Sequence, residues 1–195
     1  DMSRMVFPHI DVDREATERV VRLAQETLGD ILPVRLKTTG WATPALSRLV
    51  ASLRGLQQLL YDMLDQPADL HRLMAFLRDG ALAQLDDLER RGLLCLNNDG
   101  AYIGSGGFGW TDELPQPDFT GHVRTRDLWG FEKSQETVGV SPQMFAEFIF
   151  QYQLPILERF GLNCYGCCEP LETRWHIVER IPRLRRVSIP PWSNV

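Results

Sequence analysis

The sequence lacks several features that would assign it at once to a class of proteins. No apolar run approaches the roughly 20 residues needed to cross a bilayer, and the first residues, Asp1–Pro8, show no signal-peptide pattern. Basic residues are not in excess: the net charge is −5 over 195 residues, which argues against nucleic acid or an anionic membrane as partner. We therefore expect a cytoplasmic protein, and the initial Asp1 suggests that the chain is cut from a longer one.

Cysteine is scarce, and its distribution is uneven. Of four cysteines, three lie within Cys164–Cys168, so the spaced framework of a small secreted protein is not expected. Three interpretations stay open: thiolate ligands for a soft metal such as zinc, a redox pair of Cys164 and Cys167, or small buried core residues. A closed zinc site needs four ligands, and the sequence has no second Cys-x-x-Cys motif.

Segments with helical periodicity alternate with short apolar segments. The expected helices and strands are listed here by residue number: helices 13–28, from 44 onward, 55–65, 67–91, 141–160 and 173–179; strands 31–37, 93–97, 127–132, 162–165 and 185–189. Strands separated by helices predict an α/β fold with a parallel sheet, formed by residues 1–195 as one domain.

The stretch from Asn98 to Asp127 is long, glycine-rich and without periodicity, which is typical of an ordered functional loop. Within it, Gly104–Gly109 matches G-x-G-x-x-G. A dinucleotide site needs a helix directly after such a loop, and the two prolines that follow leave no helix there. We expect no bound nucleotide, and instead glycines that allow a tight turn or a close approach.

Polar side chains follow two of the predicted strands, where an α/β fold carries its chemistry. Asn97 and Asp99 come after one strand and are candidates for orienting a substrate; Gln135 and Glu136 follow another and are candidates for proton transfer or metal ligation. Solvated loops are the alternative for both groups. Trp129 precedes the second group and either lines a substrate pocket or packs in the core.

Two motifs together resemble a known family. Ser141-Pro-Gln-Met-Phe opens a helix, and about 20 residues later the strand Leu162–Tyr165 ends in Gly-Cys-Cys-Glu. Over residues 55–195 this pattern is similar to the uroporphyrinogen decarboxylase superfamily, which includes the cobamide-dependent methyltransferases, and is closest to its uncharacterised decarboxylase-like members. The resemblance implies a (β/α)8 barrel, of which this chain would be a truncated fragment with about five strands.

The resemblance also implies site residues and cofactors. Family methyltransferases hold zinc through His-x-Cys and a later cysteine; here the aligned triplet is Tyr165-Gly166-Cys167, so tyrosine stands in the histidine position. Cys167, Cys168 and Glu136 are the implied metal ligands, and Glu136, Gln135 and Tyr165 the implied catalytic residues. The implied reaction moves a methyl group from a folate, or from a corrinoid on a partner protein, to a thiol or similar small molecule.

Two alternatives remain open. The first is a carboxy-lyase acting on a tetrapyrrole or an aromatic acid, for which Arg35 and Lys37 would supply the cations that bind carboxylates. The arginine-bearing motif and the aspartate segment expected of true decarboxylases are missing. The second is a non-catalytic ligand-binding barrel, whose exposed sheet edges would favour a homodimer.

Overall fold

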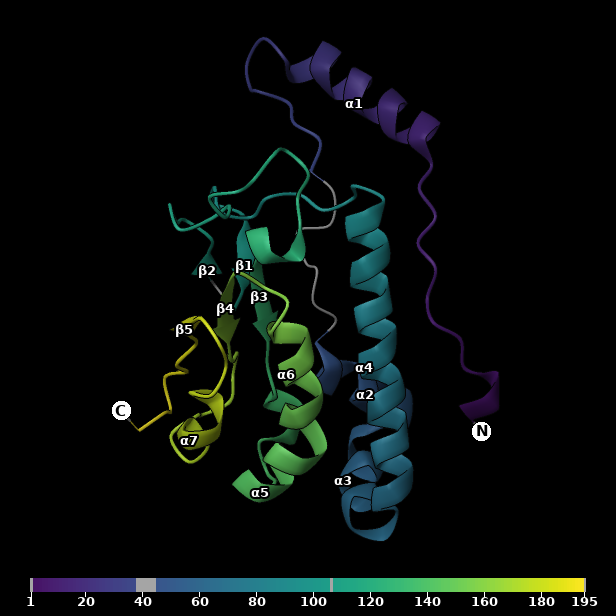
Figure 1. Ribbon diagram of the computed structural model, residues 1–195, viewed down its shortest axis with the longest axis vertical. Coiled ribbons are helices and arrows are strands. Elements are labelled where there is room, and N and C mark those ends of the chain that lie inside the picture. Colours follow the sequence, from purple (N-terminus) through teal and green to yellow (C-terminus); the bar gives the residue numbers. More distant parts are fainter. Residues whose placement is uncertain (1, 38–44, 106, 195) are drawn as a thin grey trace.

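The computed structural model describes residues 2–37, 45–105 and 107–194. The expected start of a helix at residue 44 lies outside this range. An N-terminal arm comes first and consists of a short 3-10 helix, η1 (Met2–Arg4), and helix α1 (Arg14–Leu28). Asp13 caps α1 by accepting a hydrogen bond from Ala16 N at 2.8 Å. Helix α1 lies apart from the other helices (Figure 1).

Three helices follow and form the outer layer beside the sheet (Figure 1). They are α2 (Leu46–Arg54), α3 (Leu56–Asp65) and α4 (Pro67–Arg90). The predicted helix from Pro67 is confirmed, with Pro67 in its first turn and buried residues recurring every three or four positions: Leu70, Met74, Leu77, Ala81, Leu85 and Leu88. Gly92 follows at φ +65°, a left-handed conformation that ends the helix.

The sheet is parallel, as expected. Its strands are β3 (Trp129–Glu132), β4 (Leu162–Tyr165) and β5 (Leu184–Val187), in the order β3-β4-β5. Trp129 pairs with Leu162 and Glu132 with Tyr165, so β3 and β4 end at the same level. Because the strands are parallel, each connection must cross a face of the sheet, and both contain helices.

The connection from β3 to β4 is helical from Pro142 onward. After the short turn η3 (Gln135–Thr137) come α5 (Pro142–Phe145), a π-helical segment η4 (Ala146–Phe150) and α6 (Gln151–Leu157). Ser141 caps this run by accepting from Met144 N at 3.2 Å, as predicted. The π-helical segment interrupts this helical run, and Pro155 lies further on, inside α6. Helix α7 (Trp175–Val178) connects β4 to β5.

Two predicted strands are wrong. Residues 31–37 form no strand, because nothing among the described residues pairs with them, and Ile31, Leu32 and Leu36 are exposed. Residues 93–97 form no strand either. Instead the side-chain amide of Asn97 donates to Trp129 O at 3.0 Å and accepts from Trp129 N at 2.9 Å, replacing the backbone pairing of a neighbouring strand. The described strands therefore form no closed barrel.

The glycine-rich segment covers one face of the sheet. Side chains on that face are Trp129, Phe131, Leu162 and Cys164. A hairpin of β1 (Tyr102–Gly104) and β2 (Gly107–Phe108) lies against them. A Cβ at Gly104 would overlap the Phe131 ring, and one at Gly107 would overlap the Arg186 guanidinium. The glycines allow the hairpin to approach the sheet, and no helix follows directly, as expected.

No helix in the described part of the chain is long and apolar enough to span a membrane.

Gly104→Ala should destabilise the fold by about 2 kcal/mol or more, because the new Cβ overlaps Phe131 and because φ at Gly104 is +121°. Gly139→Ala is the matched control: a Cβ added there would meet no atom within 4 Å, and the φ of Gly139 is not positive. Urea unfolding of the two variants measures the difference. Equal midpoints would show that the hairpin does not pack against β3 in this way.

Candidate functional site

Polar side chains gather where β3 and β4 end. We call Ser47, Lys133, Glu136, Cys167 and Cys168 the carboxyl-edge cluster. Lys133 Nζ forms an ion pair with Glu136 Oε1. The Ser47 hydroxyl lies 2.8 Å from both Glu136 Oε2 and the Lys133 carbonyl oxygen, and can donate to one of them at a time. The residue that follows β3 is thus fixed to a serine from α2.

The cluster is charged but partly shielded from solvent. Burial raises the pKa of Glu136, but hydrogen bonds from Lys133 and Ser47 outweigh it, and the net pKa lies below the usual value. Lys133 and Glu136 expose only 9% and 14% of their side chains, so their attraction is weakly screened. The cluster therefore presents an ionised carboxylate at neutral pH, paired with the Lys133 side chain.

A tight turn after β4 carries the two thiols. Gly166 begins it at φ +92° and donates to Glu132 O at 2.9 Å. The carboxylate of Glu169, fully buried, accepts from Ser134 N at 2.6 Å and from Cys167 N at 2.9 Å. This carboxylate ties the end of β3 to the turn after β4 and fixes where the thiols lie.

The thiols of the turn are adjacent and accessible. The Sγ atoms of Cys167 and Cys168 are 3.6 Å apart, and Cys168 is exposed. Hydrogen bonding with Cys167 raises the pKa of Cys168, and the charge of Lys133 partly offsets this, so Lys133 acts on the thiol across the cluster. Cys164 lies within β4, on the face of the sheet that the glycine-rich segment covers, and burial raises its pKa to about 11. The structure therefore pairs Cys167 with Cys168 and not with Cys164.

The buried guanidinium of Arg174 binds the backbone segment that follows β3, next to the carboxyl-edge cluster. Arg174 is 2% exposed and donates to Ser134 Oγ at 3.3 Å, to Val140 O at 3.1 Å and to Thr137 O. Its guanidinium lies over the Phe145 ring at 4.6 Å. Burial lowers the pKa of Arg174. Its role is to hold the backbone after β3, since its donors are used within the protein.

Glu132 and Tyr165 do not point into the cluster. Their side chains face the helices, where Gln153 of α6 links them: it accepts from Tyr165 OH at 2.8 Å and donates to Glu132 Oε2 at 3.0 Å. Leu46 N, at the start of α2, donates to the same oxygen at 3.2 Å. Tyr165, placed in the catalytic group by the resemblance, is fully buried in this layer. Burial raises its pKa well above the usual value.

Other predicted site residues separate into two groups. The side-chain amide of Asn97 is hydrogen-bonded to the Trp129 backbone in β3. Trp129 Nε1 donates to Gly109 O at 3.1 Å, which favours core packing for Trp129. Lys37 Nζ binds Asp99 Oδ1 at 2.7 Å, and this hydrogen bond, with the nearby charge of Arg35, lowers the pKa of Asp99. Both Lys37 and Asp99 are about half exposed. Neither group contacts the carboxyl-edge cluster among the described residues.

The expected metal ligands do not fit a zinc site. Among the described residues no three His, Cys, Asp or Glu side chains come together, whereas zinc takes three or four protein ligands. Glu136 is held by Lys133 and Ser47, and Tyr165 faces the helices. Gln135 is the remaining predicted residue. Its side-chain oxygen Oε1 is buried and has no hydrogen-bond partner in the described part of the chain.

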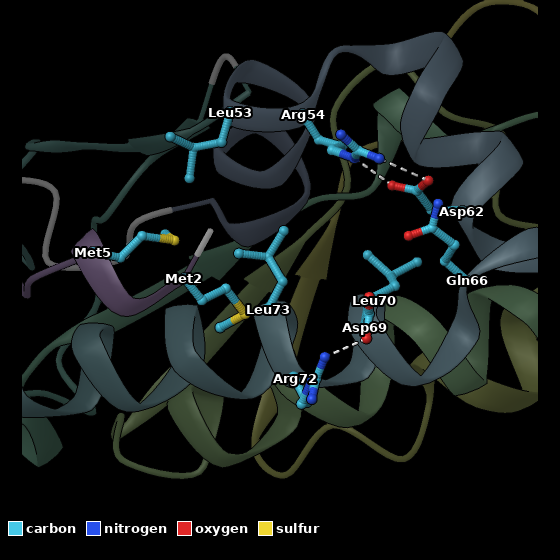
Figure 2. A pocket seen from close by; sticks show the side chains of 10 residues that line it. All are labelled: Met2, Met5, Leu53, Arg54, Asp62, Gln66, Asp69, Leu70, Arg72 and Leu73. Carbon is cyan, nitrogen blue, oxygen red and sulfur yellow. Dashed lines mark hydrogen bonds and ion pairs between the residues drawn. The ribbon is translucent and has the colours of Figure 1, made fainter.

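A pocket lies elsewhere, between η1 and helices α2, α3 and α4 (Figure 2). Its volume is about 830 Å³. Arg54 turns toward Asp62, at 2.5 Å, and Arg72 pairs with Asp69. The remaining lining is mostly apolar, including Met2, Met5, Leu53, Leu70 and Leu73. With its charges paired internally, this pocket offers no reactive group.

Sequence reasoning missed Ser47, Lys133, Glu169 and Arg174. Lys133 directly follows one predicted strand, and Glu169 ends the Gly-Cys-Cys-Glu motif after another, so both had a signal in the sequence. Ser47 and Arg174 carry no such signal, because only the tertiary fold brings α2 and the residue before α7 to this edge. No family model matches this sequence, and neither a curated protein nor a solved structure is detectably similar to it.

Glu132→Gln should flatten the pH dependence of stability. Burial raises the pKa of Glu132 to about 8, above the value of about 4.3 in an unfolded chain. Between these two pKa values the folded state binds one more proton than the unfolded chain does. Stability therefore falls as the pH rises from about 5 to 8. The slope should approach that of one proton, about 1.4 kcal/mol per pH unit.

Urea unfolding at several pH values measures this slope. Glutamine reproduces the neutral carboxylic acid, so Glu132→Gln should lose the slope and be the more stable protein at pH 8. The exposed Glu158→Gln is the control and should behave as the wild type. Parallel curves for the wild type and Glu132→Gln would show that Glu132 is ionised in the fold.

Proposed function

We propose that the protein carrying this chain is a methyltransferase of the kind found in the uroporphyrinogen decarboxylase superfamily, and that its acceptor binds at the carboxyl-edge cluster. The observation that supports this best is an ion pair of Lys133 and Glu136 after β3 and two adjacent thiols after its parallel neighbour β4. In parallel sheets, ligands bind outside the carboxyl ends of the strands. The acceptor in this proposal is a thiol or similar small molecule.

The proposed role of Lys133 is electrostatic. Only the thiolate form of a thiol is strongly nucleophilic, and an ammonium nearby favours the thiolate. The ion pair with Glu136 and the bonds of Ser47 keep Lys133 at the strand end, so the cation needs no reorganisation when the substrate binds. The acceptor sulfur then forms a bond to the methyl carbon as the bond between that carbon and the carrier breaks, and the electron pair stays on the carrier. The thiol proton passes to solvent, and a folate carrier takes up a proton at the nitrogen that loses the methyl group.

The carrier in this proposal is a folate or a corrinoid delivered by a partner protein, and it is a substrate and not a resident group. Zinc enters no step, because the described residues do not make a zinc site. Glu136 has a lowered pKa and is therefore a weak base. Its contribution is to orient Lys133, which makes it a positioning residue.

Lys133→Met should reduce methyl transfer at least tenfold at neutral pH and shift the acidic limb of the rate profile to higher pH, because the acceptor thiol then loses its stabilising cation. The assay measures methyl thioether formed by the whole protein from methylcobalamin or methyltetrahydrofolate, with 2-mercaptoethanesulfonate or homocysteine as acceptor. Glu136→Gln should show a smaller loss, and the exposed Glu158→Gln should show none.

The same preparation tests the alternatives. Absence of thioether from the wild type with every donor and acceptor would overturn the proposal. Release of carbon dioxide from a carboxylated tetrapyrrole or aromatic acid, lost in Arg35→Ala, would assign the carboxy-lyase function instead. Binding without turnover would assign the non-catalytic function.

A further inference from the structure

The two adjacent thiols that follow β4 take no part in the bond changes of the proposed methyl transfer. Their Sγ atoms are 3.6 Å apart. Cys168 is exposed, Cys167 and Cys95 are half-buried, and Cys164 is buried. A reagent in solution therefore meets this pair before it meets any other pair of sulfurs in the described part of the chain.

The turn that carries the pair is fixed by its surroundings. The Glu169 carboxylate accepts from Cys167 N and Ser134 N, and Gly166 N donates to Glu132 O. Gly166 has φ +92°, and an added Cβ would lie 3.1 Å from Leu171 and 3.2 Å from Ser188 O. Since the backbone is held on both sides, the thiols stay adjacent without a bond between them, and little conformational entropy is lost when both engage one ligand.

The geometry suits a bridging atom better than a disulfide. Consecutive Cα atoms across a trans peptide are about 3.8 Å apart, whereas disulfides usually span about 4.4–6.8 Å between Cα atoms. A disulfide between Cys167 and Cys168 would also need the sulfurs to close from 3.6 Å to about 2.0 Å. An atom that binds both sulfurs leaves them apart, close to where they already lie.

The number of donors limits which atom this can be. No third His, Cys, Asp or Glu joins the pair among the described residues. The pair therefore does not suit an ion that requires four protein ligands. Soft centres prefer sulfur, and trivalent arsenic bearing one organic group is complete with two sulfurs. Lys133 is the nearby cation and Glu169 the nearby anion acting on Cys168, and Glu169 is already engaged in the turn.

We propose that Cys167 and Cys168 form a two-sulfur binding site for trivalent arsenicals of the monosubstituted class. The reaction is a condensation: the arsenic–oxygen bond of an arsine oxide is replaced by two arsenic–sulfur bonds, both thiol protons leave with the oxygen as water, and no oxidation occurs. The inference rests on the turn itself and not on the proposed methyl transfer, so it stands or falls separately.

The test is anaerobic titration of the whole reduced protein with phenylarsine oxide, followed by intact mass and peptide mapping. The expected result is one adduct on the peptide containing Cys167 and Cys168, removed by 2,3-dimercaptopropanol and resistant to an equal concentration of 2-mercaptoethanol. Because the second sulfur adds intramolecularly, Cys167→Ser and Cys168→Ser should each bind at least 100-fold more weakly.

Two controls make the result decisive. Cys95→Ser leaves the pair intact and should keep the adduct, and circular dichroism of every variant confirms that the turn variants are folded. An adduct retained at full affinity in Cys168→Ser, removal by the monothiol as readily as by the dithiol, or a wild-type protein that forms a Cys167–Cys168 disulfide in place of an adduct would each overturn the proposal.

Discussion

The arrangement at the carboxyl edge depends on one buried carboxylate. Glu169 lies in the turn after β4, yet its closest hydrogen bond, 2.6 Å, comes from Ser134 N after β3. It is fully buried, and no hydrogen bond from Arg174 reaches it; the backbone N–H groups of Ser134 and Cys167 compensate for its desolvation instead. A buried carboxylate left without donors is costly. The fold therefore keeps β3 and the thiol turn together, and the charge of Lys133 acts on the Cys168 thiol as a consequence.

Much of the fold follows from local patterns. Pro67, Gly92 and a regular apolar spacing define α4, and the segments that become β3 and β4 are short, mostly apolar and separated by helices. Residues 31–37 have a similar apolar composition, yet they form no strand, because a strand also requires a partner and local sequence does not provide one. Asn97 shows the same limit: its side chain makes the bonds that the predicted strand would have made with its backbone.

The candidate site was only partly predictable. The sequence places Glu136, Cys167 and Cys168 after parallel strands, and the structure brings them to one edge. Tyr165 and Glu132 show why the remainder could not be predicted: alternate residues of a strand face opposite sides, and a shift of one position decides between a site and the helix-facing core. Ser47 contributes because α2 packs at this edge, which no pattern near residue 47 indicates. Arg35, Lys37 and Asp99 do assemble, but apart from the cluster.

Lys133 lies close enough to the turn that carries Cys167 and Cys168 for its charge to act on the Cys168 thiol. The most direct measurement compares the rates at which iodoacetate, an anion, and iodoacetamide, which is neutral, alkylate these two cysteines, followed by peptide mass analysis. A cation beside the thiols attracts the anionic reagent, so the ratio of the two rates should fall severalfold in Lys133→Met. An unchanged ratio would contradict the account, because Lys133 would then not share an edge with the thiols.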